Sequence, residues 1–153
     1  MRFIFSVVLI MVTACDSPTA IDDRWAVPEE IDFAASLEID LATMNRTESG
    51  LYWQDLQLGS EDAPAVTLDD EIRIHYTLWL PNGDEVDTTI GGTPFQSEVI
   101  LLIPGVAEGV TGMKRGGVRK LVIRPELAWP SGYGDIPPRT TVIFEVELIA
   151  IVM

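Results

Sequence analysis

Residues 112–129 read Gly-Met-Lys-Arg-Gly-Gly-Val-Arg-Lys-Leu-Val-Ile-Arg-Pro-Glu-Leu-Ala-Trp, and residues 142–148 read Val-Ile-Phe-Glu-Val-Glu-Leu. Apolar and polar side chains alternate in both segments, which predicts two strands joined by a loop that contains Ile136-Pro137-Pro138. The stretch carries few side chains suited to acid–base or nucleophilic chemistry. A site built from it would act through its shape and through exclusion of water.

Upstream of this stretch, residues 72–80 alternate in the same way. Pro81-Asn82-Gly83-Asp84 predicts a turn, because Asn-Gly tolerates positive φ. On the first of these strands one face carries Ile72, Ile74, Tyr76, Leu78 and Leu80, and the other carries Arg73, His75, Thr77 and Trp79. On the last strand the predicted core face holds Val142, Phe144, Val146, Leu148 and Ala150.

The predicted elements form a short series. Strands are expected at 51–58, 72–80, 85–88, 118–123 and 141–151, and a helix is expected over 104–113. Glycines make that helix weak in isolation, so packing must hold it. Several antiparallel strands with one short helix predict an α+β fold.

Composition excludes several kinds of function. The formal net charge of −14, from 10 Lys and Arg against 24 Asp and Glu, disfavours nucleic-acid binding, because phosphates require a basic surface. The chain has one Cys and one His, which disfavours a Cys/His zinc site and leaves His75 as the only base for a catalytic triad. No metal or cofactor is expected.

The N-terminus has the pattern of an export signal. Residues 1–14 join Arg2 to an apolar run that is too short to span a bilayer, which predicts a signal peptide. Val12-Thr13-Ala14-Cys15 resembles a bacterial lipobox, so Cys15 is the expected lipidation site and membrane anchor; an ordinary signal peptide with a chance Cys is the alternative. The expected location is the periplasmic side of the cell envelope, with inner or outer membrane left open.

Residues 15–50 are predicted to be an acidic tether that follows the lipidated Cys. The segment 31–44 carries scattered apolar residues that could dock on the domain, and a partner-binding segment is the alternative. Residues 51–153 form the predicted folded domain. Its basic cluster, which comprises Lys114, Arg115, Arg119, Lys120 and Arg124, is interpreted as a solvated strand face rather than a docking patch.

A series of short segments follows in order through the folded part. They are His75-Tyr76-Thr77, the Asn-Gly turn, Val86-Asp87, Pro94-Phe95, Leu102-Ile103-Pro104-Gly105, Glu108-Gly109, Gly112-Met113, Pro125-Glu126-Leu127-Ala128-Trp129, Ile136-Pro137-Pro138 and Phe144-Glu145-Val146-Glu147-Leu148. In this order the segments resemble the FKBP-type peptidyl-prolyl isomerases, over residues 51–151. The resemblance implies a curved antiparallel sheet wrapped around one short helix, with a pocket between them.

The resemblance also implies a site and an activity, which is isomerisation of the bonds before proline in polypeptide clients. The implied catalytic residues are Tyr76, Asp87, Phe95, Ile103, Trp129 and Phe144. The implied substrate-binding residues are Val86, Leu102, Val106, Tyr133 and Ile136. Within this set Ile103 offers a backbone N–H, and Asp87 orients Tyr76 or polarises the surroundings of the substrate carbonyl.

Three positions depart from the family pattern. Val106 stands where the family usually has Trp, Val86 where it has Phe, and Trp129 where it has Tyr. The first two changes widen the pocket, which predicts weak binding of macrolide inhibitors. Tyr133, in a loop shorter than in many members, could refill part of the space. The alternatives to an active isomerase are a peptide-binding module without turnover and a structural lipoprotein, and the sequence leaves the oligomeric state open.

Overall fold

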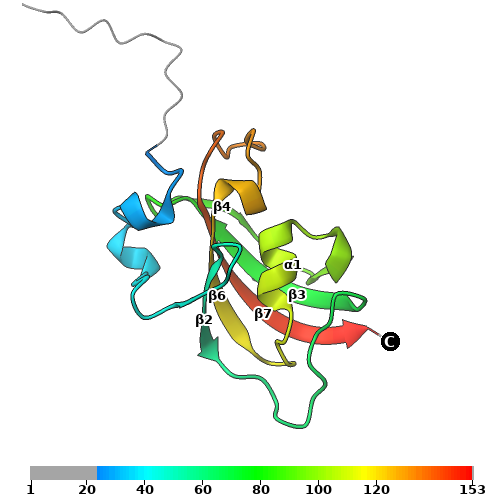
Figure 1. The fold of residues 1–153 in the computed structure, drawn as a ribbon. Coiled ribbons are helices and arrows are strands. Elements are labelled where there is room, and N and C mark those ends of the chain that lie inside the picture. Colours follow the sequence, from blue (N-terminus) through cyan, green and yellow to red (C-terminus); the bar gives the residue numbers. More distant parts are fainter. Residues whose placement is uncertain (1–23, 153) are drawn as a thin grey trace, which may run out of the picture.

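The computed structural model describes residues 24–152, which form an antiparallel sheet with one α-helix (Figure 1). The strands run in the order β1-β2-β6-β7-β3-β4, and β5 pairs with β3 beside β4. The elements are η1 (Pro28–Glu30), η2 (Ala35–Leu37), β1 (Asn45–Arg46), β2 (Tyr52–Gln57), β3 (Glu71–Trp79), β4 (Glu85–Thr88), β5 (Phe95–Glu98), η3 (Val99–Leu101), α1 (Pro104–Val110), β6 (Val118–Ile123), η4 (Pro125–Leu127) and β7 (Val142–Val152). This confirms the predicted fold class.

The predicted strands occur within one or two residues of their expected bounds, while β1 and β5 were not predicted. Alternation on β3 buries Ile72, Ile74 and Leu78 as expected. On β7 the predicted alternation fails near the end, because the register with β3 shifts between Arg73 and Ile74. This β-bulge adds one residue to β7, so the side chains beyond it point to the opposite faces of the sheet. Ile151 therefore packs against the core in place of Ala150.

The helix α1 lies against β6 on the face that holds the main core (Figure 1). It ends at Val110, three residues before the expected bound, and Gly112 follows with φ of 83°. Gly105 and Gly109 face β6, and a Cβ on either would collide with the side chains of Ile123 or Leu121. The glycines that weaken an isolated helix therefore let this one approach the sheet closely.

Residues 24–50 do not form a free tether, which corrects the expectation for this part of 15–50. In Figure 1 they lie on the side of the sheet opposite α1. Met44, with Phe33, Ile39 and Leu41 beside it, packs on Tyr52 and Val122 of that face; Leu37 is also buried. The apolar residues that could dock therefore do so. The signal segment and Cys15 lie outside the described residues.

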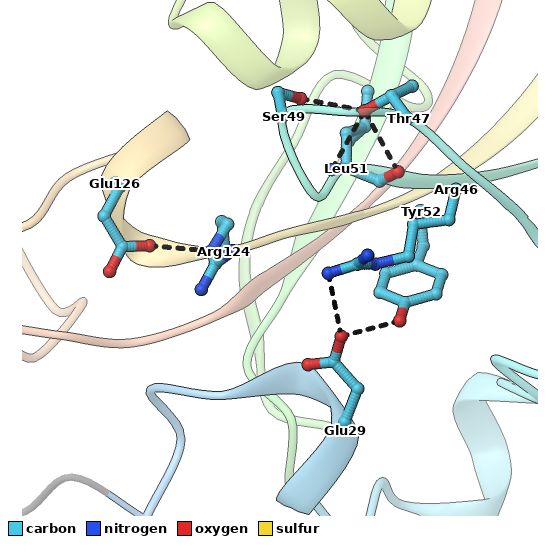
Figure 2. A network of polar contacts seen from close by, with 8 residues as sticks. All are labelled: Glu29, Arg46, Thr47, Ser49, Leu51, Tyr52, Arg124 and Glu126. Carbon is cyan, nitrogen blue, oxygen red and sulfur yellow. Dashed lines mark hydrogen bonds and ion pairs between the residues drawn. The ribbon is translucent and has the colours of Figure 1, made fainter.

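Polar contacts also fasten this N-terminal segment to the sheet. The Tyr52 hydroxyl donates to Glu29 Oε1 at 2.7 Å, and Arg46 pairs with the same carboxylate at 3.3 Å (Figure 2). The bond from Tyr52 is the main reason why the pKa of Glu29 is lowered. The Thr141 N–H donates to the Trp25 carbonyl at 2.7 Å, so the segment also holds the start of β7.

The basic cluster was wrongly interpreted as solvated at two positions. Arg119 and Lys120 are only 8% and 7% exposed. Arg119 forms two bonds with Asp55, at 2.7 and 3.0 Å, and donates to the Gly109 carbonyl at the end of α1 at 2.9 Å. On the other face Lys120 donates to the Leu37 carbonyl at 2.8 Å. Each cation is buried because it satisfies carbonyls or carboxylates of the segments that cover the sheet.

Candidate active site

One pocket of about 560 Å³ lies between the sheet, α1 and the loops around them. The structure brings all eleven candidate side chains of the domain together in its lining. They are Tyr76, Val86, Asp87, Phe95, Leu102, Ile103, Val106, Trp129, Tyr133, Ile136 and Phe144. Among the residues of 24–152, none of the helices is long and apolar enough to cross a bilayer.

Strand register explains how distant residues meet around Tyr76. Leu78 on β3 pairs with Asp87 on β4 and with Phe144 on β7, and Ile74 pairs with Phe95 on β5. Residues that pair directly point to the same face, and so do residues two apart on a strand. Tyr76, which lies between Ile74 and Leu78, is therefore flanked by all three partners on its own face.

The polar centre of the site is a hydrogen bond between Tyr76 and Asp87. The Tyr76 hydroxyl donates to Asp87 Oδ2 at 2.5 Å. Burial, with the bond to Asp87 next in size, raises the pKa of Tyr76 to about 12. The phenol therefore stays protonated at neutral pH, and it can hold the carboxylate in place but cannot act as a base.

Five aromatic rings line the pocket. Tyr76 meets Phe95 edge-on with ring centres 6.0 Å apart, and its ring centre lies 5.7 Å from that of Phe144. The ring centre of Trp129 lies 6.5 Å from that of Phe144, and the Trp129 ring stacks on Tyr133 with ring centres 5.3 Å apart. Tyr133 extends the aromatic wall outward, and its side chain is 67% exposed.

Ile103 presents a backbone donor at the edge of the pocket. It caps α1, and its carbonyl accepts from the N–H groups of Val106 and Ala107, both at 3.0 Å. Its own N–H donates to no group within residues 24–152. A peptide carbonyl in the pocket could accept this hydrogen bond. The geometry thus suits the role that the resemblance implied.

The substitutions expected to widen the pocket both lie in its lining. Val106 projects from α1 and is 4% exposed, so a larger side chain there would enter the cavity directly. Val86 is half-buried on β4 beside Asp87. A Val at either position leaves volume that a larger apolar side chain would occupy.

Five further residues line the pocket and were not among the candidates. Ile74 and Leu78 could have been found from the alternation of β3, because they share the face of Tyr76. Leu101 ends η3, and Gly134 and Asp135 lie in the loop between η4 and β7; the alternation pattern predicts the course of neither segment.

The site offers binding surface rather than reactive groups. His75 lies outside the pocket lining, and its Nδ1 is 3.1 Å from Thr89 Oγ1. No cluster of three potential metal ligands occurs among residues 24–152. The arrangement can enclose an apolar group, fix a backbone carbonyl and keep water away.

A curved sheet around one short helix, with an aromatic pocket between them, defines a class of small ligand-binding domains. Residues 63–149 match the family described as FKBP-type peptidyl-prolyl cis-trans isomerase. The chain belongs to this family.

Relatives named as isomerases and binding proteins resemble the same part of the chain. The chain is 37% identical over 110 residues to a probable FKBP-type peptidyl-prolyl cis-trans isomerase of Haemophilus influenzae, covering 67% of this chain and 43% of that one. It is 40% identical over 109 residues to an FK506-binding protein of Neisseria meningitidis, covering 67% of this chain and 96% of that one. The chain thus spans less than half of the first relative's length.

Solved structures agree with the fold. The crystal structure of FkpA from Escherichia coli aligns with a TM-score of 0.66 and 32% identity, over 76% of this chain and 63% of that one. The crystal structure of AtFKBP13 aligns with a TM-score of 0.64 and 30% identity, over 71% and 98% of the two chains.

Proposed function

We propose that the protein is a peptidyl-prolyl cis-trans isomerase that acts on proline-containing polypeptide chains. The observation that carries this proposal is the pocket itself, in which aromatic walls, the Tyr76–Asp87 bond and the unpaired Ile103 N–H converge. Family membership supports the same activity.

The pocket suits this reaction because the barrier arises from amide resonance. Rotation about the bond before proline crosses about 18–20 kcal/mol and takes tens to hundreds of seconds unaided. The twisted amide has a less polar carbonyl than the planar one, so it loses less on leaving water. An apolar pocket that fits the twisted form therefore lowers the barrier without a nucleophile or a general acid.

Each group then has a defined task. The rings of Tyr76, Phe95 and Phe144 enclose the proline ring and exclude water. The Ile103 N–H donates to a carbonyl of the bound chain and fixes its position. Asp87, held by Tyr76 at the pocket wall, polarises the surroundings of the carbonyl that rotates. These tasks need no cofactor.

A protease-free isomerisation assay on peptides that contain proline tests this function. Wild type should exceed the buffer rate, and Tyr76→Ala should lose most of that excess. Leu58→Ala, at a side chain that is 79% exposed and outside the pocket lining, is the control and should retain it. Wild type and Tyr76→Ala both at the buffer rate would overturn the proposal.

The second candidate is a peptide-binding module with little turnover. Val86 and Val106 favour it, since the smaller side chains leave room around a bound proline and hold the twisted form less firmly. Peptide binding in a titration without isomerisation would support this candidate. Loss of both on Tyr76→Ala would support the enzyme.

We further propose that the protein is exported and anchored by lipid at Cys15, and that it assists folding of exported chains at the membrane surface. The support is the apolar run before Cys15 and the small residues that precede it. Cys15→Ser should release the protein from the membrane fraction. Retention of that variant with the membranes would show that the anchor is elsewhere.

A further inference from the structure

Two carboxylates that are far apart in the sequence line the pocket. Asp87 lies on β4, and Asp135 lies in the loop between β6 and β7. Both are exposed. No Lys, Arg or His is among the lining residues within the part of the chain that the structure describes. The side chains that face a bound peptide therefore carry charge of one sign only.

The position of Asp135 is set by a tight turn. The N–H of Tyr133 donates to the Ile136 carbonyl at 3.0 Å, and the N–H of Ile136 donates back to Tyr133 at 2.9 Å. Gly134, with φ of 55°, allows this geometry. The Asp135 carboxylate itself has no hydrogen bond or ion pair within residues 24–152. Its charge is thus available to a ligand.

Exposed aromatic rings lie beside these charges. Tyr133, two residues before Asp135, is 67% exposed, and Phe95 is 42% exposed at the wall next to Tyr76. An aromatic face attracts ammonium and guanidinium groups, and a neighbouring carboxylate adds to this attraction. The pocket therefore offers two kinds of contact to a cation, and its lining within the described residues holds no cationic side chain to pair with an anion.

We propose that the site selects proline segments in which Lys or Arg lies within two residues of the proline, and that Asp135 is the specificity-determining residue. This inference rests on the proposed isomerase function and names its substrate class. Acidic flanks are disfavoured by the same charges, and the net charge of −14 acts in the same direction at longer range.

The test compares three blocked peptides, Ala-Lys-Leu-Pro-Phe, Ala-Gln-Leu-Pro-Phe and Ala-Glu-Leu-Pro-Phe, and a second set with the variable residue two positions after proline. At low salt kcat/KM should be roughly tenfold higher for the Lys peptide than for the Glu peptide in at least one set. In 1 M salt, where the screening length is about 3 Å, this ratio should fall to within about twofold.

Asp135→Asn should lower the Lys-to-Glu ratio of kcat/KM about threefold. Asp62→Asn, at an exposed carboxylate outside the pocket lining, is the matched control and should leave the ratio as in wild type. Equal rates on Lys and Glu peptides, or a ratio insensitive to Asp135→Asn, would overturn the inference. If no peptide is turned over, the isomerase proposal fails, and titration of the same peptides then decides the charge preference by the same ratios.

Discussion

The hydroxyl of Tyr76 donates to Asp87 Oδ2 across 2.5 Å and joins β3 to β4 at the centre of the pocket. This hydrogen bond holds the Asp87 carboxylate beside the aromatic walls of the pocket. Tyr76 has two proposed roles, since its hydroxyl positions Asp87 and its ring encloses the proline. A variant that removes the hydroxyl and keeps the ring tests the first role alone.

Tyr76→Phe should lower kcat/KM about tenfold, because a hydrogen bond to a charged group contributes about 1.5–3 kcal/mol and the released carboxylate can move. Tyr52→Phe, which loses the bond to Glu29 outside the pocket, is the matched control and should keep its activity. An isomerisation assay checks both. Equal activity of Tyr76→Phe and wild type would show that the ring alone is needed.

The pKa of Tyr76 predicts a pH dependence. Its value of about 12 in the folded protein lies above the value of about 10 for a free tyrosine, so folding favours the protonated phenol. The stability that this group contributes is complete below pH 10 and is lost as the pH rises toward 12. Unfolding measured between pH 8 and 12 should therefore show a decline that is smaller in Tyr76→Phe. An identical decline in both proteins would contradict the assignment.

Val106→Trp tests whether the space at the helix limits ligand binding. A tryptophan there should contact the bound ligand and raise macrolide affinity about tenfold, since burying more apolar area favours binding. Leu58→Trp adds the same side chain at an exposed position and should not change affinity. Calorimetric titration with thermal unfolding checks the result. Nanomolar affinity of the wild type, or no gain in a folded Val106→Trp, would contradict the prediction.

Met44→Ala tests whether the N-terminal segment is part of the folded domain. Met44 is 8% exposed and packs on Tyr52 and Val122, so its truncation should lower the free energy of unfolding by about 2 kcal/mol or more. Val27→Ala, at a side chain that is 36% exposed, should cost less than about 0.5 kcal/mol. Chemical denaturation measures both. No loss on Met44→Ala would mean that the segment contributes little to stability.

Much of the fold and of the pocket could be predicted from the chain. Period-two alternation locates β3, β6 and β7, because one face of each strand must be apolar. The candidate residues lie together in the pocket as the family resemblance implied, and their roles in catalysis stay predictions. Ile74 and Leu78 share the face of Tyr76, so the same alternation also places them toward the pocket.

The rest depends on tertiary contacts that a local pattern does not contain. Arg119 and Lys120 look solvated in sequence because charged side chains usually are; their burial depends on Asp55, Gly109 and Leu37, which approach only in the folded chain. The bulge that makes Ile151, and not Ala150, face the core depends on the pairing of β7 with β3. Asp135 enters the pocket lining through the conformation of a loop.

The bond between the Thr141 N–H and the Trp25 carbonyl also limits the length of chain between the folded domain and Cys15. If Cys15 carries the proposed lipid, ten residue steps separate it from Trp25, and ten residues of chain span at most about 35 Å. A free tether running to residue 50 would have reached more than three times as far. With that anchor, the docked segment would confine the domain to a thin layer above the lipid headgroups. The local concentration of emerging chains would then govern how often the pocket meets a proline.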